Sequence, residues 1–251
     1  MLIGFLGGYP IGAQGIMQAY SSGTLIKQDA SRMLAFCNNA GPAFIFGMVS
    51  QLFNDGAIAW YLWLITVLSS VLVAISIPTV GATVCCTSQP ARISIPQHIT
   101  NAVKAMANIC AWVILFRIIL TLLQTRVFNN HYILLQTFVF GFLELSNGIV
   151  QAAVISDIRV RFVCCAVFLS AGGVCVAMQT YAITKDLGLR TYIFGKILQT
   201  AYSLLISISL IPVVFSVGNG FISLILMFVC ITIILFAQVI KKSIAISKKM
   251  L

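Results

Sequence analysis

Residues 32–47 read R-M-L-A-F-C-N-N-A-G-P-A-F-I-F-G, an apolar stretch that is interrupted at its centre. Pro42 lacks a backbone N–H and clashes with a continuing helix, and Gly41 favours non-helical backbone angles. Inside a bilayer, broken backbone persists only where it is buried in protein or lines a polar cavity. The stretch therefore predicts a discontinuous membrane helix in which Asn38 and Asn39 form half of a binding site. The alternative is a proline-kinked helix whose asparagine pair hydrogen-bonds to a neighbouring helix.

The composition extends the membrane interpretation to the whole chain. Of 251 residues, 60% are hydrophobic and only 8% are charged, whereas a soluble domain carries roughly 25% charged residues. The length allows roughly eight membrane-length elements of about 20 apolar residues each. We therefore expect a polytopic protein whose surroundings are the lipid bilayer.

Neither the net charge of +10 nor the cysteine spacing indicates a nucleic-acid-binding or a metal-binding protein. The lysines and arginines are scattered over connections, as the positive-inside bias predicts, so no nucleic-acid partner is expected. No C-x-x-C pair occurs and the two histidines are far apart in sequence, so we expect no metal site and no cofactor. Nothing resembles a hydrolase triad, a phosphate-binding loop or a dinucleotide fingerprint, so no enzyme is expected.

Interruptions recur along the chain in one order, hairpin, broken helix, span and span, which predicts two repeats, 1–123 and 124–251. The first repeat comprises a hairpin at 1–20, a broken helix at 32–53 and spans at 57–80 and 105–123, and the second a hairpin at 132–155, a broken helix at 162–183, spans at 197–217 and 221–240, and a basic tail. The polar segment 81–104 predicts a loop with a short surface helix.

Two local similarities support this register. G-F-L at 4–6 matches G-F-L at 141–143, and N-A-G-P at 39–42 matches S-A-G-G at 170–173. A hairpin enters and leaves by one side, so each repeat makes three crossings and the second is inverted relative to the first. Inverted repeats with broken helices at corresponding positions are typical of secondary transporters. The predicted fold is thus an all-α membrane protein of two inverted repeats, each with a re-entrant hairpin and a discontinuous helix.

The charge distribution predicts the orientation. The side that holds the C-terminus carries eleven basic residues: Lys27, Arg32, Arg92, Lys104, Lys185, Arg190, Lys196, Lys241, Lys242, Lys248 and Lys249. The other side carries three: Arg126, Arg159 and Arg161. The positive-inside rule then predicts a multi-pass protein of the cell membrane with a cytoplasmic C-terminus.

Two charged residues are expected at membrane depth, where charge usually marks function. Glu144, the only glutamate, lies one turn before the tip of the second hairpin. It is a candidate to coordinate a cation, to carry a proton or to bind a donor on a ligand, and the alternative is a structural carboxylate paired with Arg117. Arg117 lies within a predicted span, either as an anion contact or as a side chain that reaches the interface.

Helix ends at the breaks complete the predicted site. The half-helices that follow Gly41-Pro42 and Gly172-Gly173 present free N–H groups, as do the second arms of the hairpins, and such ends bind carboxylate or phosphate. We therefore expect a small, anionic ligand, and leave open a coupling Na⁺ or H⁺ and a homo-oligomer. The candidate substrate-binding residues are Asn38, Asn39, Gly41, Gln14, Glu144, Asn147, Ser170 and Gly172.

The motifs G-F-L-G-G-Y-P-I-G-A-Q at 4–14 and R-M-L-A-F-C-N-N-A-G-P-A-F-I-F-G at 32–47 resemble the nucleoside-recognition (Gate) domain family. The resemblance is closest to the YlbJ-type (SpoVV) sporulation integral membrane proteins of endospore-forming Firmicutes. It covers nearly the whole chain, and F-L-E-L-S-N-G at 142–148 looks like that family's second Gate copy. The family is longer at its N-terminus, so the resemblance implies that scaffold helices before the first hairpin are missing from this sequence.

The resemblance also implies a function. The family is similar to concentrative nucleoside transporters and is implicated in cortex formation and in moving dipicolinate, a small aromatic dicarboxylate, into the developing spore. The expectation is therefore a permease-like transporter of a small anionic metabolite, with dipicolinate as the candidate. The alternative is a membrane sensor or scaffold for the spore envelope that transports nothing.

Overall fold

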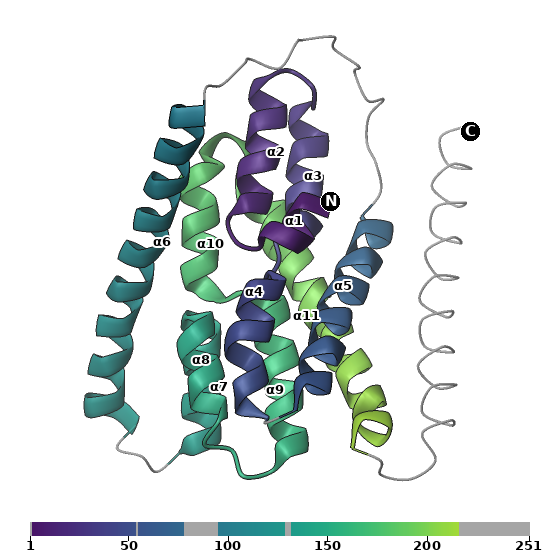
Figure 1. The fold of residues 1–251 in the computed structure, drawn as a ribbon, viewed down its shortest axis with the longest axis vertical. Coiled ribbons are helices and arrows are strands. Elements are labelled where there is room, and N and C mark those ends of the chain that lie inside the picture. The colour runs from purple at the N-terminus through teal and green to yellow at the C-terminus, as the bar shows by residue number, and fades with distance from the viewer. Residues whose placement is uncertain (1, 54, 78–94, 129–131, 216–251) are drawn as a thin grey trace.

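The computed structural model describes residues 2–53, 55–77, 95–128 and 132–215, and all regular structure in these ranges is helical (Figure 1). Five helices within them are long and apolar enough to cross a membrane, which confirms the predicted all-helical membrane fold at this level. They cover Lys27–Leu52, Gly56–Ser76, Ile95–Phe128, Ile158–Ile183 and Arg190–Val214. The predicted span 221–240 and the basic tail lie outside the described residues.

The first half of the chain contains two short helices, one interrupted helix and two long helices. They are α1 (Leu2–Gly7), α2 (Ile11–Ser21), α3 (Lys27–Cys37), α4 (Pro42–Phe44) with its π-helical and 3₁₀ continuations η1 (Ile45–Val49) and η2 (Ser50–Leu52), α5 (Gly56–Ser76), and α6 (Ile95–Leu123) with the π-helical turn η3 (Gln124–Phe128). The second half contains α7 (Ile133–Leu143), α8 (Leu145–Ala152), α9 (Ile158–Ala171), α10 (Gly173–Ile183), the 3₁₀ turn η4 (Lys185–Leu187) and α11 (Arg190–Val214).

Both predicted helix breaks are present. Between α3 and α4 the backbone is extended at Asn38 (φ −105°, ψ 95°) and at Gly41 (φ −82°, ψ 161°). Between α9 and α10 the chain passes through Gly172 and Gly173 with φ of +75° and +80°, a region that only glycine enters without strain. The two breaks therefore have different geometry, although the sequence matches them to each other.

Several helices begin earlier than predicted, among them α3 at Lys27 instead of 32 and α9 at Ile158 instead of 162. Helix α6 begins at Ile95, so residues 95–104 form no separate surface helix but continue directly into the predicted span 105–123. Pro96 is tolerated there because it lies in the first turn. Helix α11 begins at Arg190, so Lys196 lies inside a helix rather than in a basic loop. Lysine is a good helix former, and the burial of Lys196 is satisfied by partners described below. Lys196 therefore does not belong among the eleven basic residues of the connections.

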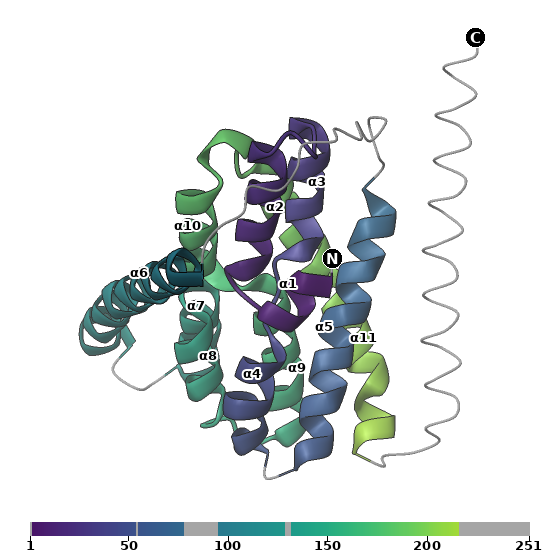
Figure 2. The ribbon, with the colours of Figure 1, turned by 45° about the horizontal axis from the view of Figure 1, so that its top comes forward.

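The short helices divide between two halves of the molecule. In Figure 1, α2, α3 and α10 lie in the upper half, and α4, α7, α8 and α9 lie in the lower half. Helix α6 stands at the outer edge in both Figure 1 and Figure 2. The two hairpins, α1–α2 and α7–α8, therefore lie towards opposite ends. Each interrupted helix has one part in the upper half and one part in the lower half.

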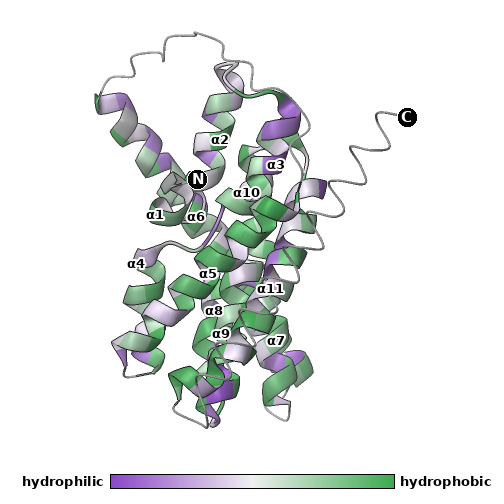
Figure 3. Ribbon diagram, turned by 90° about the vertical axis from the view of Figure 1, so that its right-hand side faces the viewer, coloured by the Kyte–Doolittle hydropathy of each residue, from purple (hydrophilic) through white to green (hydrophobic). Residues whose placement is uncertain are grey.

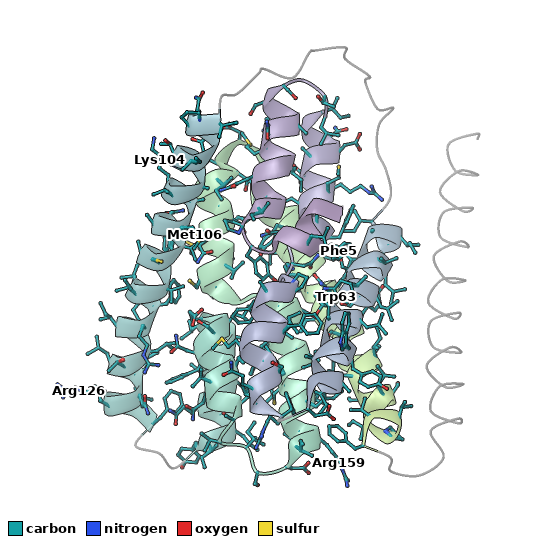
Figure 4. All side chains as sticks on the ribbon, in the orientation of Figure 1. Phe5, Trp63, Lys104, Met106, Arg126 and Arg159 are labelled. Carbon is teal, nitrogen blue, oxygen red and sulfur yellow. The ribbon has the colours of Figure 1, made fainter. Side chains whose placement is uncertain are left out.

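Polarity and charge follow the same long axis. Hydrophilic residues gather towards the two ends in Figure 3, with hydrophobic residues between them. Lys104 lies near one end of α6, and Arg126 and Arg159 lie at the opposite end of the molecule (Figure 4). This separation agrees with the assignment of Lys104 to one side of the predicted topology and of the two arginines to the other.

Glycines let the first hairpin approach the first break closely and let the two arms of the second hairpin approach each other. A Cβ on Gly4 or on Gly12 would run into the carbonyl oxygen of Cys37, and one on Gly148 would run into the backbone of Gly141. Small residues at helix contacts allow such backbone approach in membrane proteins. The first hairpin is therefore seated directly on the end of α3, beside the break.

Two glycines of α2 give a matched test of this seating. Gly12→Ala should lower the free energy of unfolding by about 1–3 kcal/mol, because the methyl group would overlap the Cys37 carbonyl. Gly15→Ala should raise it by about 0.5–1 kcal/mol, because a Cβ there meets open space and alanine favours a helix. Unfolding of the purified protein in mixed detergent micelles measures both, and equal effects at the two positions would contradict the seating.

Candidate functional site

A cavity of about 280 Å³ lies where both hairpin turns meet the first break. Its walls come from the first hairpin turn, the start of α4, the start of α8, and the faces of α6 and α10. The lining residues are Gly7, Gly8, Tyr9, Ala40, Gly41, Ala43, Phe44, Ile109, Val113, Glu144, Leu145, Ser146, Val176 and Gln179. Of the predicted site residues, the cavity wall thus includes Gly41 and Glu144.

Asn39 lies behind this wall and is fully buried. Its Nδ2 donates to the Phe36 carbonyl at 2.7 Å, which the break has deprived of a helical partner, and to Ser70 Oγ at 3.2 Å. Its Oδ1 accepts from Lys196 Nζ at 3.2 Å and from Gln199 Nε2 at 2.8 Å. Asn39 therefore joins the first break to α5 and α11, as the alternative interpretation of the asparagine pair predicts.

Asn38 is also fully buried, and its Nδ2 donates to Thr180 Oγ1 at 2.8 Å. Thr180 lies on α10, the half-helix that follows the second break. Asn38 thus connects the first break to the second interrupted helix. Both asparagines stabilise the centre of the fold from behind the cavity, so their contact with a ligand stays a prediction.

Lys196 is the unexpected member of this centre. It lies on α11 with only 5% of its surface exposed. Its ammonium group donates to Gln199 Oε1 at 2.9 Å, to Asn39 Oδ1 at 3.2 Å and to the Tyr9 hydroxyl at 3.3 Å. The three N–H donors of a lysine ammonium therefore have three acceptors. These acceptors are a phenol and two amides, so they satisfy its hydrogen bonds without neutralising its charge.

Tyr9 separates Lys196 from the cavity. Its side chain lines the cavity, and its ring centroid lies 5.3 Å from Lys196 Nζ, close enough for a cation–π interaction. Its hydroxyl accepts from Lys196 and donates to the Leu169 carbonyl at 3.3 Å. A Cβ on Gly172 would lie 2.8 Å from the same hydroxyl. Through these contacts Tyr9 packs the first hairpin turn against the second break.

Glu144 caps the helix that it precedes. Its Oε1 accepts from the Ser146 backbone N–H at 3.0 Å, and its Oε2 accepts from the Asn147 backbone N–H at 2.7 Å. Oε2 also accepts from Ser146 Oγ at 2.6 Å and from Asn147 Nδ2 at 2.5 Å. The N-terminus of α8 is therefore occupied by the protein's own carboxylate. This corrects the expectation that the second arm of this hairpin presents a free N-terminus to an anion.

Arg117 reaches Glu144 through Asn147. Its Nη1 donates to Asn147 Oδ1, so the chain Arg117–Asn147–Glu144 links α6 to the second hairpin. Glu144 is 3% exposed and Asn147 is 9% exposed, whereas Arg117 lies on an exposed part of α6. The predicted relation between Arg117 and Glu144 therefore exists, but an asparagine mediates it.

The remaining predicted residues lie away from the cavity wall. Gln14 is half-buried on α2, and Ser170 is fully buried near the end of α9 with its Oγ lacking a hydrogen-bond partner. Gly172 is buried beside Tyr9. The structure thus brings Gly41 and Glu144 to one cavity, with Asn147 bonded to Glu144 behind the wall. Gln14, Ser170 and Gly172 lie outside the cavity lining.

Sequence reasoning missed Tyr9, Lys196 and Gln199 as site residues. A signal for the last two is present in α11, whose buried residues recur at helical spacing: Tyr192, Gly195, Lys196, Gln199, Ser203, Ile206, Ser207 and Leu210. A lysine that shares a buried stripe with a glutamine and two serines indicates a polar helix face turned inward. Because Lys196 follows basic residues of a connection, the sequence pattern alone assigns it to that connection and not to the buried face of α11.

The cavity wall has a mixed apolar and polar composition. Within the described ranges, no group of three His, Cys, Asp or Glu side chains comes together that could hold a metal ion. The cavity combines an apolar wall, which includes Phe44 and Val113, with polar groups at Tyr9, Glu144 and Gln179. Such a combination is typical of small-molecule sites.

Comparison with known proteins adds no relative to this description. No protein-family model matches the chain, and no curated protein and no solved structure matches it.

Proposed function

We propose that the chain forms a membrane transporter for a small anionic metabolite. The observation that carries this proposal is the cavity of about 280 Å³ lined by both hairpin turns, the first break and α10. Small-molecule sites are typically concave, largely apolar and equipped with a few polar groups. Secondary transporters build such sites at interrupted helices between two repeats.

The proposal includes the two inverted repeats. Helices α1–α2, α3–α4, α5 and α6 follow the order of α7–α8, α9–α10 and α11, with the last predicted span beyond the described residues. The position of the hairpins towards opposite ends supports inversion (Figure 1). In this arrangement the hairpins are re-entrant, and movement of one repeat against the other opens the cavity alternately to each side.

The charges near the cavity support an anionic ligand. Lys196 and Arg117 are two cations, and Glu144 is one carboxylate whose hydrogen bonds are directed to its own helix. Lys196 is buried without a carboxylate partner, and a buried charge is costly unless it is paired, so an anion in the cavity would be favoured. By the resemblance of residues 4–14 and 32–47, dipicolinate is the first candidate, in a sporulation role at the cell membrane with a cytoplasmic C-terminus.

A second candidate function is a membrane sensor or scaffold of the spore envelope that binds its ligand without transport. Asn38 and Asn39 favour it, because both are fully buried and bonded to protein groups. A centre held in this way can be rigid rather than mobile. Ligand binding by the purified protein without transport of that ligand into liposomes would support this function.

Flux through the purified full-length protein tests the transporter. Reconstituted in liposomes, it should take up radiolabelled dipicolinate with saturation, above the level of protein-free liposomes. Val113→Trp should reduce this uptake at least about tenfold, because the indole would fill the cavity that Val113 lines.

The matched control is Ile114→Trp, since Ile114 is the next residue of α6 and is 60% exposed. Its uptake should equal that of the unmodified protein. Absence of saturable flux for dipicolinate, for other dicarboxylates and for nucleosides would overturn the transporter. Equal loss in the two tryptophan variants would remove the cavity from the transport path.

A further inference from the structure

We propose that Lys196, acting through Tyr9, makes the cavity selective for ligands that carry a carboxylate on an apolar body. The inference rests on the proposed binding of a small metabolite in this cavity and names the group that selects it. Lys196 and Tyr9 come from opposite parts of the chain, α11 and the first hairpin turn. Their contact places the charge directly behind the cavity wall.

Lys196 has no negatively charged partner among its hydrogen-bond acceptors. Gln199, Asn39 and Tyr9 accept its three hydrogen bonds and contribute no negative charge. A charge in a low-dielectric environment acts strongly over several ångströms, because little water screens it. In the protonated form of Lys196, the positive potential of the ammonium group therefore extends past Tyr9 into the cavity, and an anion there favours this form.

Tyr9 lies between Lys196 and the cavity and can connect the two through its hydroxyl. The Tyr9 hydroxyl donates to Leu169 O at 3.3 Å, and this bond is long for an O–H donor. A carboxylate in the cavity offers a stronger acceptor, because hydrogen bonds to ionised groups are about twice as strong as neutral ones. Tyr9 can then donate to the ligand while it still accepts from Lys196, and the ammonium group polarises this donor.

The remaining wall of the cavity determines what the rest of the ligand can be. Phe44, Leu145, Ile109, Val113 and Val176 supply apolar wall. The carboxylate of Glu144 lies at the cavity wall and repels a second anionic group in its direction. A ligand with an apolar body and a carboxylate towards Tyr9 therefore fits the chemistry of the wall, and any second carboxylate must point away from Glu144.

Benzoate and benzamide test the selection, because they have the same shape and differ in charge. Equilibrium binding to the detergent-solubilised full-length protein should favour benzoate over benzamide at least about tenfold. Lys196→Met should remove this preference by weakening benzoate and leaving benzamide unchanged. Lys196→Arg should keep the preference for benzoate, because the positive charge remains. Tyr9→Phe should keep a weaker preference, because the charge remains but the hydroxyl donor is lost.

The control is Lys185→Met, which removes a lysine from an exposed position before α11 and should leave the preference intact. Equal binding of benzoate and benzamide by the unmodified protein would overturn the proposal, and this result needs no variant to fold. A preference that persists in Lys196→Met would overturn it as well. Because binding is measured without a membrane gradient, absence of transport would leave this inference standing.

Discussion

Glu144→Ala should lower the free energy of unfolding by about 2–4 kcal/mol, well beyond the loss of an ordinary helix cap. The carboxylate satisfies two backbone N–H groups at the start of α8, and it also accepts from Ser146 Oγ and Asn147 Nδ2. Without it, the buried side-chain amide of Asn147 loses its acceptor. Asn147 is then held less firmly, and so is its hydrogen bond from Arg117. Unfolding in mixed detergent micelles measures the change.

Asp157→Ala supplies the matched control for this prediction. Asp157 caps α9 by accepting from the Arg159 backbone N–H at 2.8 Å, and it is exposed. Its removal should cost only about 1 kcal/mol, the usual value of a cap. Glu144→Asp should fall between the two, since aspartate caps a helix well but is too short to keep every bond. Equal losses for Glu144→Ala and Asp157→Ala would show that the Asn147–Arg117 connection contributes nothing to stability.

The sequence predicted the helix breaks because glycine and proline act locally. Gly41-Pro42 and Gly172-Gly173 interrupt their helices wherever they are placed, so a single chain suffices to locate both. The helix starts were less accurate, since α6 and α11 begin before the apolar runs do. A helix in a membrane protein can extend through polar residues that tertiary contacts satisfy, and composition alone does not report those contacts.

The site was predicted in part for a related reason. Asn38, Asn39 and Glu144 attract attention as polar residues in apolar surroundings, and the structure places them at or behind one cavity. Whether such a group faces a ligand or the protein depends on partners far along the chain. Asn39 meets Lys196 across 157 positions, a pairing that local patterns do not contain.

Gly41→Ala should lower the free energy of unfolding by about 1–3 kcal/mol and weaken ligand binding with it. A Cβ on Gly41 would lie 2.9 Å from the Cα of Gly8 and 3.0 Å from its nitrogen. Backbone atoms of a tight turn cannot rotate away as a side chain can, so the first hairpin turn and the first break must separate. Both residues line the cavity, and their separation would also move Tyr9 away from Lys196.

The effect of Gly41→Ala is steric, because alanine readily adopts the observed φ of −82° and ψ of 161°. Gly47→Ala, in the helix that follows the same break, controls for the general effect of adding a methyl group. A Cβ at Gly47 meets open space, so this variant should gain about 0.5–1 kcal/mol. If the two variants proved equally stable and bound benzoate equally, the contact between Gly8 and Gly41 would not hold the cavity together. A loss at Gly41 alone would identify this contact as the point where the first hairpin is fixed to the site.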